Sequence, residues 1–114
     1  MNCSSVAGLV GFPGLPAYVA SKHGIVGLTK TAALECAKDG VRVNAVCPGV
    51  IDTAMVERLT THHPETKAAL AAGEPIGRTG APEEIASAVV WLLSDDASFL
   101  TGQAIAVDGG WVAQ

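Results

Sequence analysis

A short run rich in β-branched residues, Val41–Cys47, stops abruptly at Pro48-Gly49. Runs of this kind, bounded by turn residues, are typical of strands. The segment before it, from about Tyr18 to Lys38, carries apolar residues at helical steps of three and four. These apolar residues are Ile25, Leu28, Ala32 and Cys36. The sequence therefore predicts a helix that leads directly into a strand.

A second helix and a second strand follow in the same order. The helix is expected to begin at Pro82. The backbone N–H groups of a first helical turn have no partner within the helix, so a proline, which lacks this N–H, is well tolerated there. Glu83 and Glu84 then suit the positive end of the helix dipole. The strand is expected from about Gln103 to Val107, where the chain turns at Asp108-Gly109-Gly110.

A long connection, Ile51–Ala81, lies between the first strand and the second helix, with a short helix predicted from Glu65 to Ala72. Connections of this length are usually lids or binding loops. The order helix, strand, lid, helix, strand indicates an α/β domain with a parallel sheet. Met1–Ser4 is expected to be the end of a third strand. Three strands with helices on one face would expose an apolar surface or an unpaired edge, so we expect part of a domain.

Composition excludes several classes of protein. Hydrophobic residues make up 49% and charged residues 16% of the chain, which excludes intrinsic disorder. The net charge of −4 provides no basic surface for a nucleic acid. Apolar runs such as Ala88–Leu93 are too short to cross a membrane, and no secretory signal is visible. We therefore expect a cytoplasmic protein with neither nucleic-acid nor membrane partners.

Cysteine and histidine residues give no indication of a metal site. Cys3, Cys36 and Cys47 are odd in number and form no CxxC pair, so we expect them to be reduced and mostly buried. His62 and His63 are adjacent in a polar loop with no further ligand nearby. No metal is therefore expected.

Tyr18 and Lys22 stand one helical turn apart and therefore on the same face of the predicted helix. A tyrosine hydroxyl is almost fully protonated at pH 7. An ammonium group nearby stabilises the phenolate and makes the hydroxyl a usable general acid or base. The same spacing also occurs in ordinary surface pairs, so the pair needs support from elsewhere in the chain.

Two further groups are expected at the carboxyl ends of strands, where open α/β sheets bind ligands. Ser5 precedes Tyr18 by thirteen residues, and its hydroxyl can donate to a carbonyl oxygen that gains negative charge. At Pro48-Gly49, proline fixes the strand exit and glycine lets a ligand approach the backbone. The Ile51 N–H and the Thr53 hydroxyl could then bind an amide, although a plain strand-exit turn explains these residues equally well.

Together these motifs resemble the C-terminal half of a short-chain dehydrogenase/reductase. The resemblance covers essentially the whole chain, in order and at the family's spacings. It implies a doubly wound parallel-sheet (Rossmann) fold, NAD or NADP as cofactor, and hydride transfer between a carbonyl and an alcohol. The matching residues are Ser5, Tyr18, Lys22, Val41–Gly49, Thr53 and Val107–Gly110.

The resemblance also implies a role for each residue. Tyr18 would exchange a proton with the substrate oxygen, Lys22 would stabilise the phenolate and hold the nicotinamide ribose, and Ser5 would hold the substrate oxygen. The segment from Ala54 to about Gly77 would be the substrate lid. The helices and the last strand would pair subunits in homodimers or tetramers that act on a small alcohol or carbonyl compound. The residues that would line the nicotinamide are Pro48, Gly49, Ile51 and Thr53.

Several family motifs are missing from this sequence. They are the glycine-rich TGxxxGxG turn, the acidic or basic residue that separates NAD from NADP, the NNAG segment and the catalytic asparagine. We therefore expect residues 1–114 to be the C-terminal half of a single NAD(P)-binding domain, inactive on its own. The alternative is a truncated, inactive chain that serves only in assembly. The presence of Ser5, Tyr18 and Lys22 favours the enzyme, because an assembly module has no need of them.

Overall fold

The computed structural model of the chain describes residues 1–61 and 64–114. Three strands form one parallel sheet in the order β1-β2-β3. Ala45 in the central strand pairs with Asn2 on one side and with Ala104 on the other. His62 and His63, for which no metal site is expected, lie outside the described residues. The strands are β1 (Asn2–Cys3), β2 (Ala45–Pro48) and β3 (Ala104–Val107).

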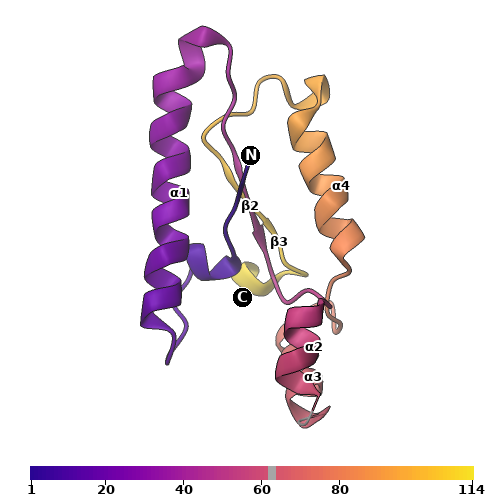
Figure 1. Cartoon of the computed structure of the whole chain (residues 1–114). Helices are drawn as coiled ribbons and strands as arrows, with labels where there is room; N and C mark the ends of the chain where they lie inside the picture. The colour runs from indigo at the N-terminus through magenta and orange to yellow at the C-terminus, as the bar shows by residue number, and fades with distance from the viewer. Residues whose placement is uncertain (62–63) are drawn as a thin grey trace.

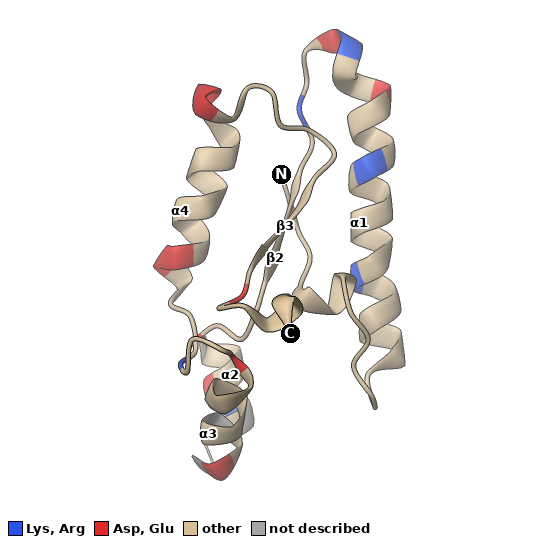
Figure 2. Ribbon diagram, turned by 180° about the vertical axis from the view of Figure 1, so that it is seen from behind, with Lys and Arg blue, Asp and Glu red and all other residues tan. Residues whose placement is uncertain are grey.

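Helices cover both faces of this sheet. α1 (Pro16–Cys36) and α4 (Pro82–Leu93) lie on opposite sides of the strands, as Figures 1 and 2 show from two directions. α1 contacts β1 and β2, whereas α4 contacts β2 and β3. Because both faces are covered, the apolar residues at the start of β2 are completely buried, as in other parallel sheets.

The long helix begins at Pro16, slightly earlier than predicted, and its buried face differs from the predicted one. Leu28 belongs to the predicted face and is 62% exposed. Thr29 is buried because its hydroxyl is satisfied: Oγ1 donates to the Ile25 carbonyl at 2.8 Å and accepts from Asn2 Nδ2 at 2.9 Å. The buried face is therefore displaced by one residue. Its members are Val26, Thr29 and Ala33.

β2 begins at Ala45, later than the predicted strand, because side chains bind the segment before it. The Arg42 guanidinium donates to the Leu92 carbonyl at 2.8 Å, at the end of α4. The Asn44 side chain donates to the Leu100 carbonyl at 2.7 Å, in the loop that leads to β3. Side-chain hydrogen bonds thus fix residues 42–44 against the end of α4 and the loop before β3.

α4 begins at Pro82 and β3 ends at Val107, which confirms both predictions. Glu84 stabilises the start of the helix, because its carboxylate accepts the Ala81 N–H at 2.8 Å and two hydrogen bonds from Arg78 at 2.7 and 2.8 Å. The Arg78 guanidinium, followed by the Ala81 N–H, lowers the pKa of Glu84 to about 2.

The long connection forms two helices, α2 (Ala54–Thr60) and α3 (Pro64–Gly73). They contact each other and extend beyond the sheet at the end where β2 and β3 finish (Figure 1). α3 confirms the predicted short helix. The sequence analysis misses α2, which begins after Thr53, whose Oγ1 accepts the Val56 N–H at 3.4 Å. The two ends of the connection meet in a parallel bridge between Ile51 and Gly80.

The three cysteines differ in burial. Cys47 in β2 is buried, Cys36 at the end of α1 is half-buried, and Cys3 in the edge strand β1 is exposed. The expectation of mostly buried cysteines is therefore wrong for Cys3. All three are free thiols, as predicted.

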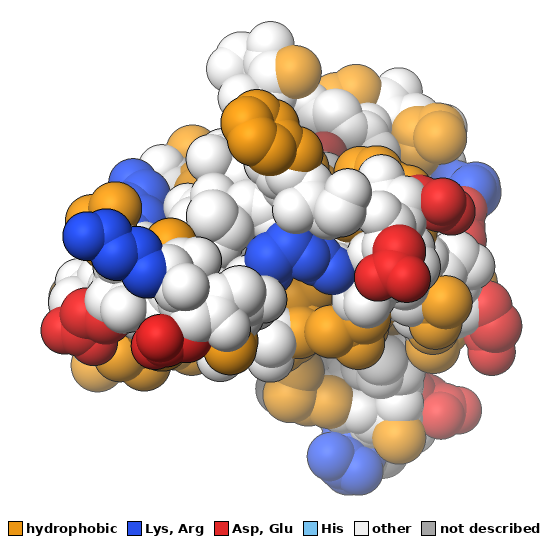
Figure 3. All heavy atoms as spheres, turned by 90° about the horizontal axis from the view of Figure 1, so that it is seen from above, with side chains coloured by type: hydrophobic (Ala, Val, Ile, Leu, Met, Phe, Trp, Pro, Cys, Tyr) orange, Lys and Arg blue, Asp and Glu red, His pale blue; other side chains and the backbone are white. Residues whose placement is uncertain are grey.

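Large hydrophobic side chains are also exposed, and Figure 3 shows hydrophobic groups between charged ones on one face of the molecule. No described helix is both long enough and apolar enough to span a membrane. The exposed groups on and after α4 are Val90, Trp91, Leu93 and Phe99, and those on α1 are Tyr18, Leu28 and Leu34.

Candidate active site

Several segments meet at the carboxyl end of the sheet. β1 leads into the short 3-10 helix η1 (Val6–Gly8), β2 leads into residues 49–53, and β3 leads into the turn before η4 (Trp111–Ala113). α1 begins at the same end (Figure 1). Open α/β sheets bind their ligands at this end. The predicted site residues therefore lie at the carboxyl end of the sheet, where a ligand is expected.

Tyr18 and Lys22 form one turn at the start of α1. Lys22 Nζ lies 5.5 Å from the centre of the Tyr18 ring, within the range of a cation–π contact. The same Nζ lies 3.5 Å from the Cys3 carbonyl, at the end of β1, and donates to it. Tyr18 is 43% exposed, so a ligand can reach it. The structure thus brings the phenol and the ammonium group together beside the end of a strand.

Ser5 stands between β1 and η1. Its Oγ accepts the Ala7 N–H at 3.1 Å and caps η1, a contact that leaves the hydroxyl proton free for another acceptor. The neighbouring Ser4 is buried, and its hydroxyl donates to the Lys22 carbonyl at 2.8 Å. That bond ties the segment of Ser5 to the helical turn that carries Tyr18 and Lys22.

Sequence analysis misses two residues of this junction, Ser4 and Gly8. A Cβ on Gly8 would lie 2.8 Å from the Lys22 carbonyl oxygen and would overlap Ser4 Oγ. Glycine alone therefore fits between η1 and α1 without displacing one of them. The only sequence signal is a glycine at the start of a stretch rich in glycine and proline, and such a stretch predicts no more than a turn.

Cys47 lies behind Ser5 at the end of the central strand. Burial raises the pKa of the Cys47 thiol, and the neighbouring Ser4 side chain and Ser5 backbone partly offset this increase. The thiol therefore lies close to the segment that carries Ser5.

The exit of β2 is closely packed at Gly49. A Cβ there would lie 2.7 Å from Glu74 Oε1 and 2.9 Å from the Asp108 Cα. The groups that approach Gly49 in the structure belong to the protein itself, so its own packing already requires a glycine at this exit.

Ile51 and Thr53 present two polar groups beyond this exit. In the bridge between Ile51 and Gly80, the Val50 carbonyl and the Asp52 N–H make the hydrogen bonds, at 2.9 and 2.8 Å. The Ile51 N–H therefore points away from Gly80, and it has no acceptor among the described residues. Thr53 uses its oxygen as the cap of α2, which leaves its hydroxyl proton available.

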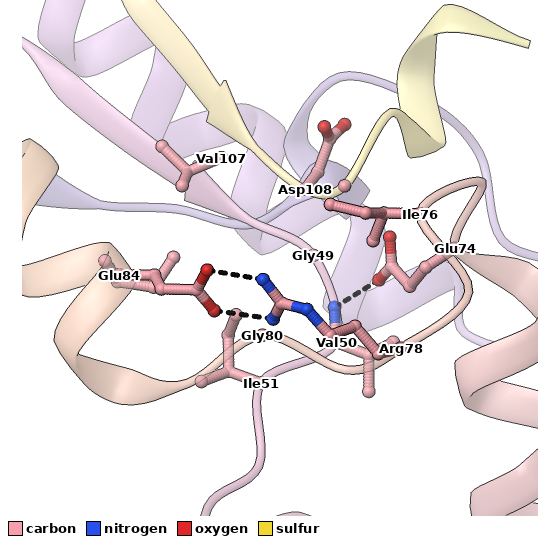
Figure 4. Close-up of a pocket in the computed structure, with 12 residues that line it drawn as sticks. Gly49, Val50, Ile51, Glu74, Ile76, Arg78, Gly80, Glu84, Val107 and Asp108 are labelled. Atoms are coloured by element: carbon pink, nitrogen blue, oxygen red, sulfur yellow. Dashed lines mark hydrogen bonds and ion pairs between the residues drawn. The ribbon is translucent and has the colours of Figure 1, made fainter.

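A cavity of about 80 Å³ lies between the exits of β2 and β3 (Figure 4). Glu74, which lines it, is 2% exposed, and its Oε1 accepts the Val50 N–H at 2.7 Å. Glu74 Oε2 is buried and meets no donor among the described residues. Burial raises the pKa of Glu74, the Val50 N–H lowers it, and the negative charge of Asp108 raises it.

The closing motif, Val107–Gly110, has a structural role. The two carboxylate oxygens of Asp108 accept the N–H groups of Gly110 and Val112, each at 3.0 Å. This turn presents Trp111, whose ring stacks on Phe12 with the centroids 5.6 Å apart. Phe12 lies between Ser5 and Tyr18 in the sequence, so the C-terminal turn packs against the loop that connects two site residues.

Comparison with known proteins decides the family. A family model described as enoyl-(acyl carrier protein) reductase matches residues 1–112. The chain belongs to the short-chain dehydrogenase/reductase family. A curated relative, 2-(S)-hydroxypropyl-CoM dehydrogenase 3 of Xanthobacter autotrophicus, is 53% identical over 99% of this chain and 46% of its own length. The chain thus spans about half the length of the curated relatives it matches.

Solved structures similar to this chain show the same fold. A 4-hydroxyisoleucine dehydrogenase complexed with NADH is 40% identical, with a TM-score of 0.92 over 99% of this chain and 46% of that one. A structure described as ElxO with NADP bound is 34% identical, with a TM-score of 0.92 and the same coverage. The predicted α/β fold, part of a doubly wound parallel-sheet domain, is confirmed.

Proposed function

We propose that the full-length protein is an NAD(P)-dependent oxidoreductase that interconverts a ketone and a secondary alcohol. The observation that carries this proposal is the turn of Tyr18 and Lys22, with the ammonium 5.5 Å from the phenol ring at the carboxyl end of the sheet. The Ser4 hydroxyl, bonded to the Lys22 carbonyl, keeps Ser5 beside this turn. The dehydrogenases similar to this chain support the same chemistry.

Each of the three residues has one task in this proposal. Tyr18 donates its hydroxyl proton to the substrate carbonyl oxygen during reduction, and it removes the alcohol proton during oxidation. The Lys22 ammonium stabilises the negative charge that then resides on the Tyr18 oxygen. Ser5 donates a hydrogen bond to the same substrate oxygen, where charge develops during the reaction.

The residues at the exit of β2 fit a nicotinamide carboxamide. The Ile51 N–H has no acceptor among the described residues, and the hydroxyl proton of Thr53 is not used by its capping contact. Pro48 and Gly49 present backbone beside them, and Lys22 offers donors for ribose hydroxyls. When bound, the nicotinamide of NAD or NADP supplies or accepts the hydride. The protein's share is to hold the carboxamide and the substrate oxygen in a fixed relation.

We also infer that residues 1–114 form the C-terminal half of one NAD(P)-binding domain, with the substrate lid at residues 54 to about 77. α2 and α3 extend beyond the ligand end of the sheet, and the bridge between Ile51 and Gly80 closes the base of the lid (Figure 1). Exposed hydrophobic side chains on α1 and α4 support a homodimer or homotetramer.

The substitution Tyr18→Phe in the full-length protein tests this proposal. Phenylalanine keeps the ring beside Lys22 but has no proton to transfer, so we expect kcat/KM to fall by about 10²–10⁴-fold. The dissociation constants of NADH and NADPH, measured by fluorescence titration, should remain close to those of the unmodified protein. Retention of most of the activity by the Phe variant would show that Tyr18 is not the acid or base.

A further inference from the structure

Glu74 is a buried carboxyl group wedged between the exits of two strands. A Cβ on Gly49, after β2, would lie 2.7 Å from its Oε1, and a Cβ on Gly109, after β3, would lie 3.3 Å from its Oε2. Its side chain points from the end of the lid toward Val50, as Figure 4 shows. The two glycines thus leave the space that the carboxyl group occupies.

This arrangement costs the fold free energy. Burial of a polar atom without a hydrogen-bond partner destabilises a protein, and Glu74 Oε2 has no donor among the described residues. An apolar side chain of similar length would fill the same space without that cost. The contact that such a side chain could not make is the 2.7 Å hydrogen bond from the Val50 N–H to Oε1.

That hydrogen bond holds the peptide group that precedes the one carrying the Ile51 N–H. Val50 is held on both sides, because its N–H donates to Glu74 and its carbonyl accepts the Gly80 N–H at 2.9 Å. A trans peptide group carries its C=O and N–H on opposite sides. With the Val50 carbonyl held by Gly80, the Ile51 N–H of the same peptide group is turned to the opposite side. Glu74 holds the preceding peptide group, so the two bonds together restrain the backbone of Val50, about which the Ile51 N–H would otherwise turn.

We propose that Glu74 is a positioning residue for the cofactor, which holds Val50 so that the Ile51 N–H is aimed at the nicotinamide carboxamide. The inference rests on the proposed function, because Ile51 binds the carboxamide only if the protein uses NAD(P). It makes Glu74, at the end of the lid, part of the cofactor site without direct contact with the cofactor.

A matched pair of variants in the full-length protein tests this role. Glu74→Gln keeps an oxygen that accepts the Val50 N–H, whereas Glu74→Met has similar length and no comparable acceptor. Glu83→Gln, on the exposed first turn of α4, removes one negative charge away from the cavity and serves as the control. Thermal unfolding establishes that each variant is folded before binding is measured.

Two readouts separate positioning from simple stability. Hydrogen exchange of the cofactor-free protein should show loss of protection at the Val50 amide in the Met variant and its retention in the Gln variant. The dissociation constant for NADH or NADPH should rise at least tenfold in the folded Met variant and stay within about threefold of the unmodified protein in the Gln and Glu83→Gln variants. A role confined to stability would change the melting temperature and leave the dissociation constant unchanged.

The outcomes that contradict the inference differ from those that contradict the proposed function. A folded Met variant that binds cofactor as tightly as the Glu83→Gln control overturns the positioning role and leaves the proposed function intact. If the Met variant does not fold, a tenfold loss of affinity in the folded Gln variant overturns the role, because Gln keeps the acceptor. An unmodified protein that binds neither NADH nor NADPH overturns both the proposed function and this inference.

Discussion

The substitution Gly8→Ala tests the junction that holds Ser5 against α1. The added methyl group would lie 2.8 Å from the Lys22 carbonyl oxygen, inside the 3.4–4 Å of an ordinary contact, and would overlap Ser4 Oγ. The methyl group fits only if η1 moves away from α1 and the Ser4 hydroxyl leaves its acceptor. Both changes displace Ser5 from the turn that carries Tyr18 and Lys22.

The expected loss of stability follows from two terms. Overpacking of a close contact costs about 1–3 kcal/mol. Separation of the buried Ser4 hydroxyl from the Lys22 carbonyl costs about 1–3 kcal/mol more. Since 1 kcal/mol shifts the melting temperature of a protein of about 150–250 residues by about 2–4 °C, we expect a decrease of roughly 5–20 °C.

The effect on activity should be at least as clear. A displacement of about 1 Å between reacting groups can lower a rate by about 10²-fold, so we expect kcat to fall by that order. Circular dichroism would follow thermal unfolding of the full-length protein with and without the substitution. The kcat of each would be measured well below the melting temperatures of the two proteins. Gly11→Ala is the matched control, because a Cβ there meets no atom within 4 Å. A Gly8→Ala protein that melts and turns over like the Gly11→Ala control would refute the reasoning.

Two further predictions concern stability. Thr29→Val should lower the free energy of unfolding, measured in urea, by about 1–3 kcal/mol, because it leaves Asn2 Nδ2 without its acceptor. Thr29→Ser keeps the hydroxyl and should lose less stability; equal losses in the two variants would contradict this explanation. Glu84 has its pKa lowered to about 2, so its stabilising contribution is present above the unfolded value of 4.5 and is lost as the pH falls toward 2. The difference in free energy of unfolding between the unmodified protein and Glu84→Gln should therefore be largest near neutral pH and shrink on acidification. Urea unfolding at several pH values checks this. A difference that grows below pH 4.5 would show that the ion pair is not the origin of the stabilisation.

Local signals in the sequence predict much of the fold. The start of α4 follows from Pro82, because a proline at the first helical position has no backbone N–H that would lack a partner. The position of β3 follows from an apolar run that ends at a turn. Tyr18 and Lys22 meet because four residues on a helix make one turn. These features depend on residues that are close together in the chain, so they can be predicted from the sequence.

The remaining features depend on contacts between distant residues. Thr29 in α1 is buried because Asn2 of β1 donates a hydrogen bond to its hydroxyl. The apolar pattern of α1 alone points to the wrong face of that helix. Glu74 resembles an ordinary lid residue until the fold brings it against Val50. The stacking of Trp111 on Phe12 joins the two ends of the chain. No repeating pattern of residues in the sequence predicts these contacts, because their partners lie far apart in the chain.

The most direct test of the proposed active site is a crystal structure of the full-length protein with NADH or NADPH bound. We predict that the carboxamide lies within about 3.2 Å of the Ile51 N–H, with the Tyr18 hydroxyl facing the nicotinamide across the substrate site and Lys22 on the ribose. A nicotinamide bound away from the carboxyl ends of β1 and β2, or an Ile51 N–H bonded to the protein instead, would contradict the account.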